Sequence, residues 1–192
     1  WFDVVAGEAP DRPAVQIVEA DLSLRSWTYG ELSRRSDQVA AWLTGLGIRR
    51  GDHLIVMLGN TIELWEVMLA ITKLGAVSIP TSTLLSASDL AYRIDHGRAR
   101  AVVSLGTLGD RLADIDDGIL RIGIGDGIPA GWERFADSAD APTVFEPDGP
   151  TPATDTSLLY FTSGTTNRPK LVQHTHASYP IGHLSTMWWL GV

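Results

Sequence analysis

The chain of 192 residues carries 15 lysine and arginine residues against 23 aspartate and glutamate residues, a formal net charge of −8. A negative surface gives no general attraction to nucleic acid or anionic lipid, so neither is an expected partner and a polyanion would need a local group of donors. The 44% hydrophobic content excludes a disordered chain, the lack of cysteine excludes disulfides and thiolate nucleophiles, and no apolar run predicts a membrane span.

The absence of cysteine is typical of an intracellular protein, and we expect a cytoplasmic location. The chain starts at Trp1 rather than at methionine, and it stops on the apolar run 186–192. We therefore expect the native protein to extend beyond these ends, and a targeting segment could have preceded Trp1.

The predicted elements alternate between strand and helix. Two extended runs flank Ala20 and Asp21, the pattern of a β-hairpin, and leucine and valine recur at helical spacing between Gly30 and Leu46. Short apolar runs predict buried strands, and segments with serine or threonine before them and glycine behind them predict helices. In chain order we expect a strand at 53–58, a helix at 61–75, a strand at 76–80, a helix from Ser86 or Ser88 to 96, a strand at 100–105, a helical segment at 107–116 and a strand at 120–125.

The last third of the chain begins with residues 126–156, rich in glycine, proline, aspartate and alanine, which we expect to form an exposed connection with a short helix near Trp132. A strand at 157–162, a polar loop, an extended run at 171–175 and a helix from about Ala177 follow. This alternation favours a layered α/β domain with a mostly parallel sheet flanked by helices. Sites in such folds lie at the carboxyl ends of strands, where this loop would lie.

The polar loop has the composition of a phosphate site. Its hydroxyl groups can donate hydrogen bonds, Gly164 allows the backbone to approach an oxyanion, and Lys170 supplies a positive charge. It is not a Walker A loop, because no second glycine precedes Lys170 and Leu171 follows it. An ordinary surface turn is the alternative. The candidate phosphate-binding residues are Thr162, Ser163, Gly164, Thr165, Thr166, Asn167 and Lys170.

The run YFTSGTTNRPKLVQHTH, residues 160–176, resembles the phosphate-loop motif of the adenylate-forming (AMP-binding) superfamily. Further similarity lies in TYGEL at 28–32, in the glycine–aspartate pair at 51–52 and in the segment GAVSIP at 75–80. The superfamily includes acyl-CoA synthetases, peptide-synthetase adenylation domains and luciferases. Leu171 and the tail HLSTMWWLGV make the chain most similar to the acetyl- and medium-chain acyl-CoA synthetases.

The resemblance implies an AMP-forming acid–CoA ligase active in fatty acid metabolism. A carboxylate would attack the α-phosphate of ATP and expel pyrophosphate, and coenzyme A would then capture the acyl-adenylate. The substrates and cofactors implied are ATP, Mg²⁺, coenzyme A and a small carboxylic acid. Lys170 would be the catalytic residue, because it faces the charge that builds on pyrophosphate.

The match to the motif departs at two positions. Asn167 stands where the family has a second glycine, and asparagine tolerates a left-handed backbone. Leu171 stands where the family has the glycine after the lysine, so we expect its side chain where the backbone usually approaches the nucleotide.

Four other side chains are candidates with alternatives. His176 matches the family's Thr-His position and would contact the nucleotide or acyl pocket, or else have a structural role near the start of the helix. His174 and His176 would share one face of a strand, but no third ligand is visible and we predict no metal site. Trp188 and Trp189 would pack in a core or line an acyl pocket.

The family's ribose-binding aspartate, its adenine-binding segment and its late lysine have no counterpart in residues 1–192. The chain therefore resembles the N-terminal part of the large AMP-binding domain, and we expect that part to be inactive alone. Two alternatives remain open, a non-catalytic nucleotide-binding or interaction module and the adenylation domain of a peptide synthetase.

Overall fold

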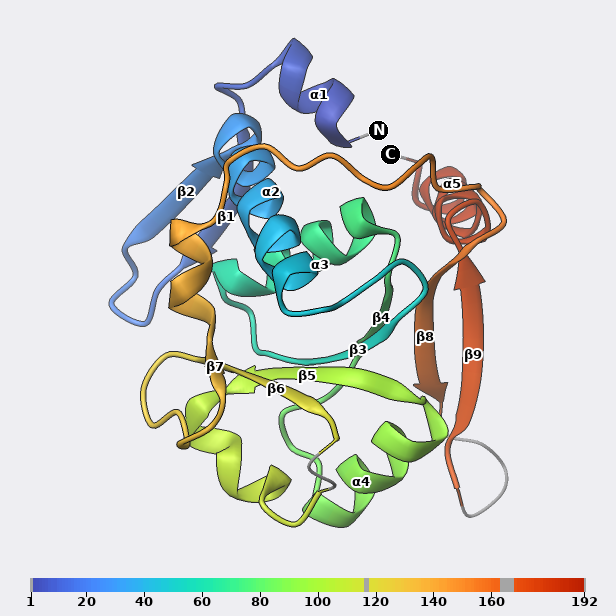
Figure 1. Ribbon diagram of the computed structural model, residues 1–192. Coiled ribbons are helices and arrows are strands. Elements are labelled where there is room, and N and C mark those ends of the chain that lie inside the picture. Colours follow the sequence, from blue (N-terminus) through green and yellow to red (C-terminus); the bar gives the residue numbers. More distant parts are fainter. Residues whose placement is uncertain (1, 116–117, 163–167, 192) are drawn as a thin grey trace.

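The computed structural model describes residues 2–115, 118–162 and 168–191. Within these ranges the main sheet has seven strands in the order β7-β6-β5-β3-β4-β8-β9 (Figure 1). The pairs are parallel except for β8 and β9, which are antiparallel. The predicted α/β fold with a mostly parallel sheet is therefore confirmed. The strands are β3 (His53–Met57), β4 (Val77–Pro80), β5 (Ala99–Leu105), β6 (Leu120–Ile124), β7 (Glu133–Arg134), β8 (Thr156–Thr162) and β9 (Lys170–Thr175).

Helices cover both faces of this sheet. Helices α2 (Tyr29–Gly45) and α3 (Ile62–Leu74) lie on one side, and α4 (Ala87–His96) lies on the other (Figure 1). Because successive strand residues point to opposite faces, β3 contributes Leu54 to the core under α2 and α3 and Ile55 to the core on the α4 side. The sheet is thus buried on both faces, as its apolar strands predicted.

Local sequence explains where the helices begin and end. The Thr28 side chain and Glu31 form a reciprocal capping box at the start of α2. Ser86 accepts a hydrogen bond from the backbone of Asp89 at the start of α4. Gly75 ends α3 with a φ of 75°, a conformation that favours glycine. The ends at Gly75 and Ser86 confirm the sequence-based prediction, whereas the cap at Thr28 was not predicted.

The N-terminal part adds α1 (Phe2–Glu8) and the antiparallel hairpin of β1 (Pro13–Val18) and β2 (Leu24–Thr28), which confirms the predicted hairpin. Lys73 of α3 links α1 to α2, because its ammonium nitrogen lies 2.7 Å from a carboxylate oxygen of Asp3 and 2.7 Å from one of Asp37. This largely buried cation therefore has two anionic partners.

Residues 126–156 are mostly exposed, as expected, and they include a short helix that begins at Phe135, close to the segment predicted near Trp132. They contain β7 and the 3₁₀ helix η2 (Phe135–Asp140), in which Phe135 and Ser138 are 5% and 0% exposed. Arg35 of α2 explains this burial, because it donates to Ser138 Oγ at 2.6 Å and its guanidinium carbon lies 5.2 Å from the centre of the Phe135 ring. The helical segment expected at 107–116 is the 3₁₀ helix η1 (Gly106–Leu112).

The chain ends with β8, β9 and α5 (Ser178–Leu190), which confirms the extended run and the final helix with Pro180 in its first turn. Trp188 and Trp189 are each 87% exposed, so the expectation that they pack in a core is wrong for this chain. Figure 1 shows α5 beside the β8–β9 hairpin. Among the described residues, no helix combines the length and apolar character needed to cross a membrane.

Candidate phosphate site at the β8–β9 hairpin

The β8–β9 hairpin positions the predicted phosphate loop. Thr162, the last residue of β8, pairs with Lys170, the first residue of β9. The Thr162 hydroxyl also donates to the Lys170 carbonyl oxygen at 3.4 Å. Both residues are exposed and lie where the two strands meet the loop. The structure therefore brings these two predicted site residues together. Ser163, Gly164, Thr165, Thr166 and Asn167 lie outside the described residues.

The two faces of the hairpin have different surroundings. The strand register places Thr162 and Lys170 on the same face as Tyr160 and Val172. Leu171 pairs with Phe161, and both side chains pack against the core cluster on the α4 side of the sheet. The Leu171 side chain therefore points away from the Lys170 face. The strand turns that side chain toward the core, and its effect on nucleotide binding stays a prediction.

The Lys170 face also carries an aromatic group shared with α5. The Tyr160 and Tyr179 hydroxyl oxygens lie 3.4 Å apart, and the two rings are stacked with centroids 6.3 Å apart. Burial, together with the hydrogen bond to Tyr179, raises the pKa of Tyr160 to about 12. Tyr160 is neutral at physiological pH, as an unperturbed tyrosine also is, and Lys170 carries a positive charge on this face.

His176 lies at the other end of the hairpin. Thr175, the residue before it, pairs with Thr156 at the start of β8, about 20 Å of strand from Thr162 (Figure 1). The His176 backbone N–H donates to the Asp155 carbonyl oxygen at 3.1 Å. Burial lowers the pKa of His176, and Arg50 adds to this effect while Asp155 opposes it. The structure therefore does not bring His176 to Lys170.

The sequence analysis predicted that His174 and His176 do not form a metal site. The His174 ring packs edge-on against Tyr160 and Tyr179, at centroid distances of 5.8 and 5.6 Å. Within residues 2–115, 118–162 and 168–191, no group of three histidine, aspartate or glutamate side chains has the arrangement of a metal site.

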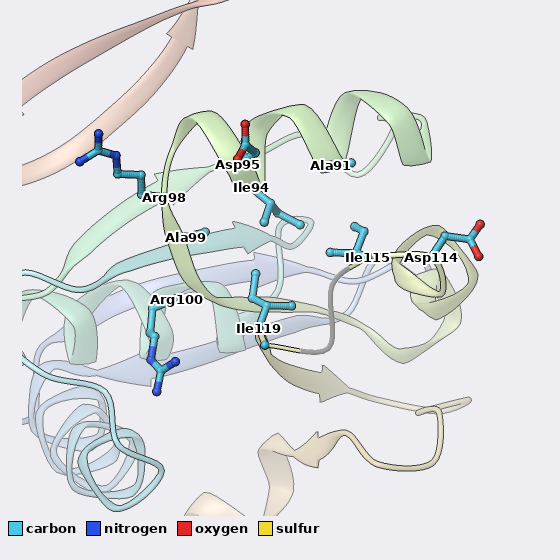
Figure 2. Close-up of a pocket in the computed structure, with 10 residues that line it drawn as sticks. Ala91, Ile94, Asp95, Arg98, Ala99, Arg100, Asp114, Ile115 and Ile119 are labelled. Atoms are coloured by element: carbon cyan, nitrogen blue, oxygen red, sulfur yellow. The ribbon is translucent and has the colours of Figure 1, made fainter.

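A cavity of about 500 Å³ lies elsewhere, between α4, the start of β5 and the start of β6 (Figure 2). Ile94, Ile115 and Ile119 converge in it, whereas the charged ends of Arg98 and Arg100 point away from them. Of the predicted phosphate-binding residues that the structure describes, neither Thr162 nor Lys170 lines this cavity. Its centre is apolar, and the described part of its rim carries the charged residues Asp95, Arg98, Arg100 and Asp114.

The sequence analysis missed Tyr92 of α4. Its hydroxyl donates to the Pro169 carbonyl oxygen at 3.2 Å, so it touches the residue directly before Lys170. A sequence signal existed, because Tyr92 and His96 are aromatic residues four apart on one helix face. Nothing in that spacing, however, specifies the hairpin as the contact.

Comparison with known proteins gives consistent results. Residues 2–191 match the family described as AMP-binding enzyme. The uncharacterized acyl-CoA ligase YtcI of Bacillus subtilis is 37% identical over 164 residues, which cover 84% of this chain and 30% of the relative. The mitochondrial acyl-coenzyme A synthetase ACSM5 of Homo sapiens is 30% identical over 186 residues, which cover 94% of this chain and 32% of the relative.

Solved structures agree with these relatives. The anthranilate CoA ligase AuaEII, in complex with anthranoyl-AMP, superposes with a TM-score of 0.77 at 26% identity, covering 95% of this chain and 36% of that one. An acyl-CoA synthetase of Brucella canis superposes with a TM-score of 0.79 at 28% identity, covering 86% of this chain and 31% of that one. The chain thus spans about a third of the length of the proteins it matches.

Proposed function

Since this chain belongs to the AMP-binding enzyme family, we propose that it is part of an ATP-dependent, AMP-forming acid–CoA ligase. In the first step a carboxylate oxygen attacks the α-phosphorus of ATP and pyrophosphate leaves. In the second step the thiol sulfur of coenzyme A attacks the acyl carbon, and AMP leaves. The observation that carries the proposal is the pairing of Thr162 with Lys170 at the base of a hydroxyl-rich loop.

Lys170 would act on the leaving pyrophosphate. It is exposed on its face of the hairpin, where its charge can meet an anion. Oriented donors that stabilise charge as it develops lower a barrier more than donors that bind the ground state equally well. Thr162 adds a hydroxyl group from the opposite strand. We propose that residues 163–167 contribute the remaining hydroxyl, amide and backbone donors.

We propose that Mg²⁺ accompanies ATP and neutralises phosphate charge, the usual role of that ion in phosphoryl chemistry. A nucleotide contact by His176 stays a prediction, and the position of His176 at the far end of β9 gives it no support. The cytoplasmic location also stays a prediction, because the relatives include mitochondrial proteins. Fatty acids are the first acids to test, in line with the proposed role in fatty acid metabolism.

The chain covers 30 to 32% of the two relatives described above, so the whole reaction is proposed for the full-length gene product. The non-catalytic module and the peptide-synthetase domain are the competing functions. Formation of a free acyl-CoA thioester would distinguish a CoA ligase from a peptide synthetase, which would load a carrier domain. Absence of any adenylation would support the non-catalytic module.

ATP–pyrophosphate exchange on the full-length gene product, with a panel of carboxylic acids, tests the proposal. We expect Lys170→Ala to lower the exchange rate about 100-fold, since loss of one well-placed donor raises the barrier by about 3 kcal/mol. Arg134→Ala is the matched control, because Arg134 is an exposed cation on the opposite edge strand β7. An exchange rate in Lys170→Ala equal to that of Arg134→Ala would contradict the assigned role.

A further inference from the structure

Helix α4 contacts both sides of the base of the loop through one side chain. The Tyr92 hydroxyl donates to the Pro169 carbonyl oxygen at 3.2 Å. The guanidinium carbon of Arg168 lies 5.2 Å from the centre of the same ring. On the other strand, the Phe161 ring centroid lies 6.2 Å from that of Tyr92. Tyr92 therefore touches the residue before the end of β8 and the two residues directly before Lys170.

The orientation of Tyr92 is fixed by its own neighbours. Its ring stacks on His96 with an interplanar angle of 10° and a centroid distance of 5.3 Å. Phe161 is held in turn by Arg93, whose guanidinium carbon lies 5.0 Å from the ring centre, and by His96 at 6.0 Å. Cation–π and aromatic contacts of this kind favour one orientation of a ring. The contacts with His96 and Phe161 therefore hold the Tyr92 side chain in the rotamer that directs its hydroxyl at Pro169.

Within residues 2–115, 118–162 and 168–191, the Lys170 side chain has no comparable support. Among the described residues, no hydrogen bond or ion pair holds its ammonium group, and the residue is exposed. Its position is set through its backbone, which is fixed by the pairing with Thr162 on one side and by Pro169 on the other. Displacement of a catalytic group by about 1 Å can reduce a rate strongly, so whatever fixes this backbone affects the reaction.

We propose that Tyr92 is a positioning residue for Lys170, acting through its hydrogen bond to the Pro169 carbonyl group and its ring contacts with Arg168 and Phe161. The inference rests on the function proposed above for Lys170. Under this proposal, helix α4, which has no other assigned part in the chemistry, holds Lys170 in position.

Tyr92→Phe tests this proposal, because it removes the hydroxyl group and keeps the ring contacts. We expect kcat for ATP–pyrophosphate exchange in the full-length gene product to fall about two- to tenfold, the effect of one lost hydrogen bond, with KM for ATP nearly unchanged. Tyr29→Phe is the control, because Tyr29 is also half-buried but lies at the start of α2, far along the chain from the hairpin. Its kcat should equal that of the wild type.

A double-mutant cycle separates positioning from general stability. If Tyr92 acts through Lys170, the substitution Tyr92→Phe should have no further effect on kcat in a Lys170→Ala background. The same fold loss in both backgrounds, or no loss in the single variant, would overturn the proposal.

Hydrogen exchange provides a readout that does not need activity. In Tyr92→Phe, amides in peptides covering residues 168–172 should exchange faster than in the wild type and in Tyr29→Phe. If the wild-type protein exchanges no pyrophosphate with any acid, the proposed function fails, and hydrogen exchange still decides whether Tyr92 holds this segment. Faster exchange then supports the structural role, and unchanged exchange overturns it.

Discussion

The ion pair between Arg35 and Glu66 gives a stability prediction that can be worked from the geometry. Arg35 Nε lies 3.0 Å from Glu66 Oε2, and the two side chains are 21% and 10% exposed. Arg35 also holds the segment around Ser138 against α2. Removal of one partner of a buried pair costs about 3–5 kcal/mol, because the other charge is left unpaired. Since Arg35 keeps some solvent contact, we expect Arg35→Met to cost about 3 kcal/mol.

The pH dependence of this loss has a definite sign. Burial raises the pKa of Glu66 above 4.5 even with Arg35 opposing the shift, so loss of Arg35 should raise it further. A carboxyl group whose folded-state pKa is raised keeps its stability at low pH and loses it as pH rises through that pKa. The deficit of Arg35→Met should therefore be smaller at about pH 5 than at about pH 8.

Urea unfolding at both pH values measures the deficit. Arg25→Met is the control, because its ion pair with Glu19 at 3.3 Å is solvent-exposed and should contribute at most about 1 kcal/mol. The double variant Arg35→Met/Glu66→Met should recover most of the loss, since it leaves no buried charge. A deficit for Arg35→Met no larger than that of Arg25→Met, or one that does not change with pH, would refute the reasoning.

Two further predictions concern Gly75 and His176. Gly75→Ala should destabilise the protein by about 1–2 kcal/mol in urea unfolding, because Gly75 has a φ of 75° and a Cβ would lie 2.5 Å from Arg50 Nη1. Gly45→Ala is the control and should not destabilise the protein, because a Cβ there would have nothing within 4 Å. Equal losses of stability in the two variants would contradict the argument. His176→Gln should lose less stability than the wild type as pH falls below about 6.5, because burial lowers the pKa of His176 and the folded state takes up its proton less readily. Thermal unfolding at pH 7.5 and 5.5 checks this, and parallel curves for the two proteins would count against it.

The elements and the loop were predictable because their signals are local. The apolar run at β3 fills the cores on both faces of the sheet, and Thr28 and Gly75 mark helix ends through short-range hydrogen bonds and backbone conformation. The hydroxyl-rich segment between Thr162 and Lys170 likewise carries its chemistry within a few residues.

The contacts that were missed join residues far apart in the chain. Phe135 is buried against Arg35, a residue 100 positions earlier, so the composition of its mostly exposed segment did not indicate this burial. His176 is six residues from Lys170 in the sequence, but the antiparallel strand β9 carries it to the other end of the hairpin. Tyr92 meets Pro169 only because α4 packs against that hairpin. Tertiary packing, rather than local pattern, decides each of these cases.

Isotope transfer tests the central claim most directly. A carboxylic acid that supports exchange is labelled with ¹⁸O in both carboxyl oxygens and incubated with ATP, coenzyme A and the full-length gene product. If the carboxylate attacks the α-phosphorus, one labelled oxygen stays on phosphorus when coenzyme A displaces AMP. Mass spectrometry should then find AMP with one ¹⁸O and an acyl-CoA that keeps the other. Unlabelled AMP, or ADP as the nucleotide product, would contradict adenylation.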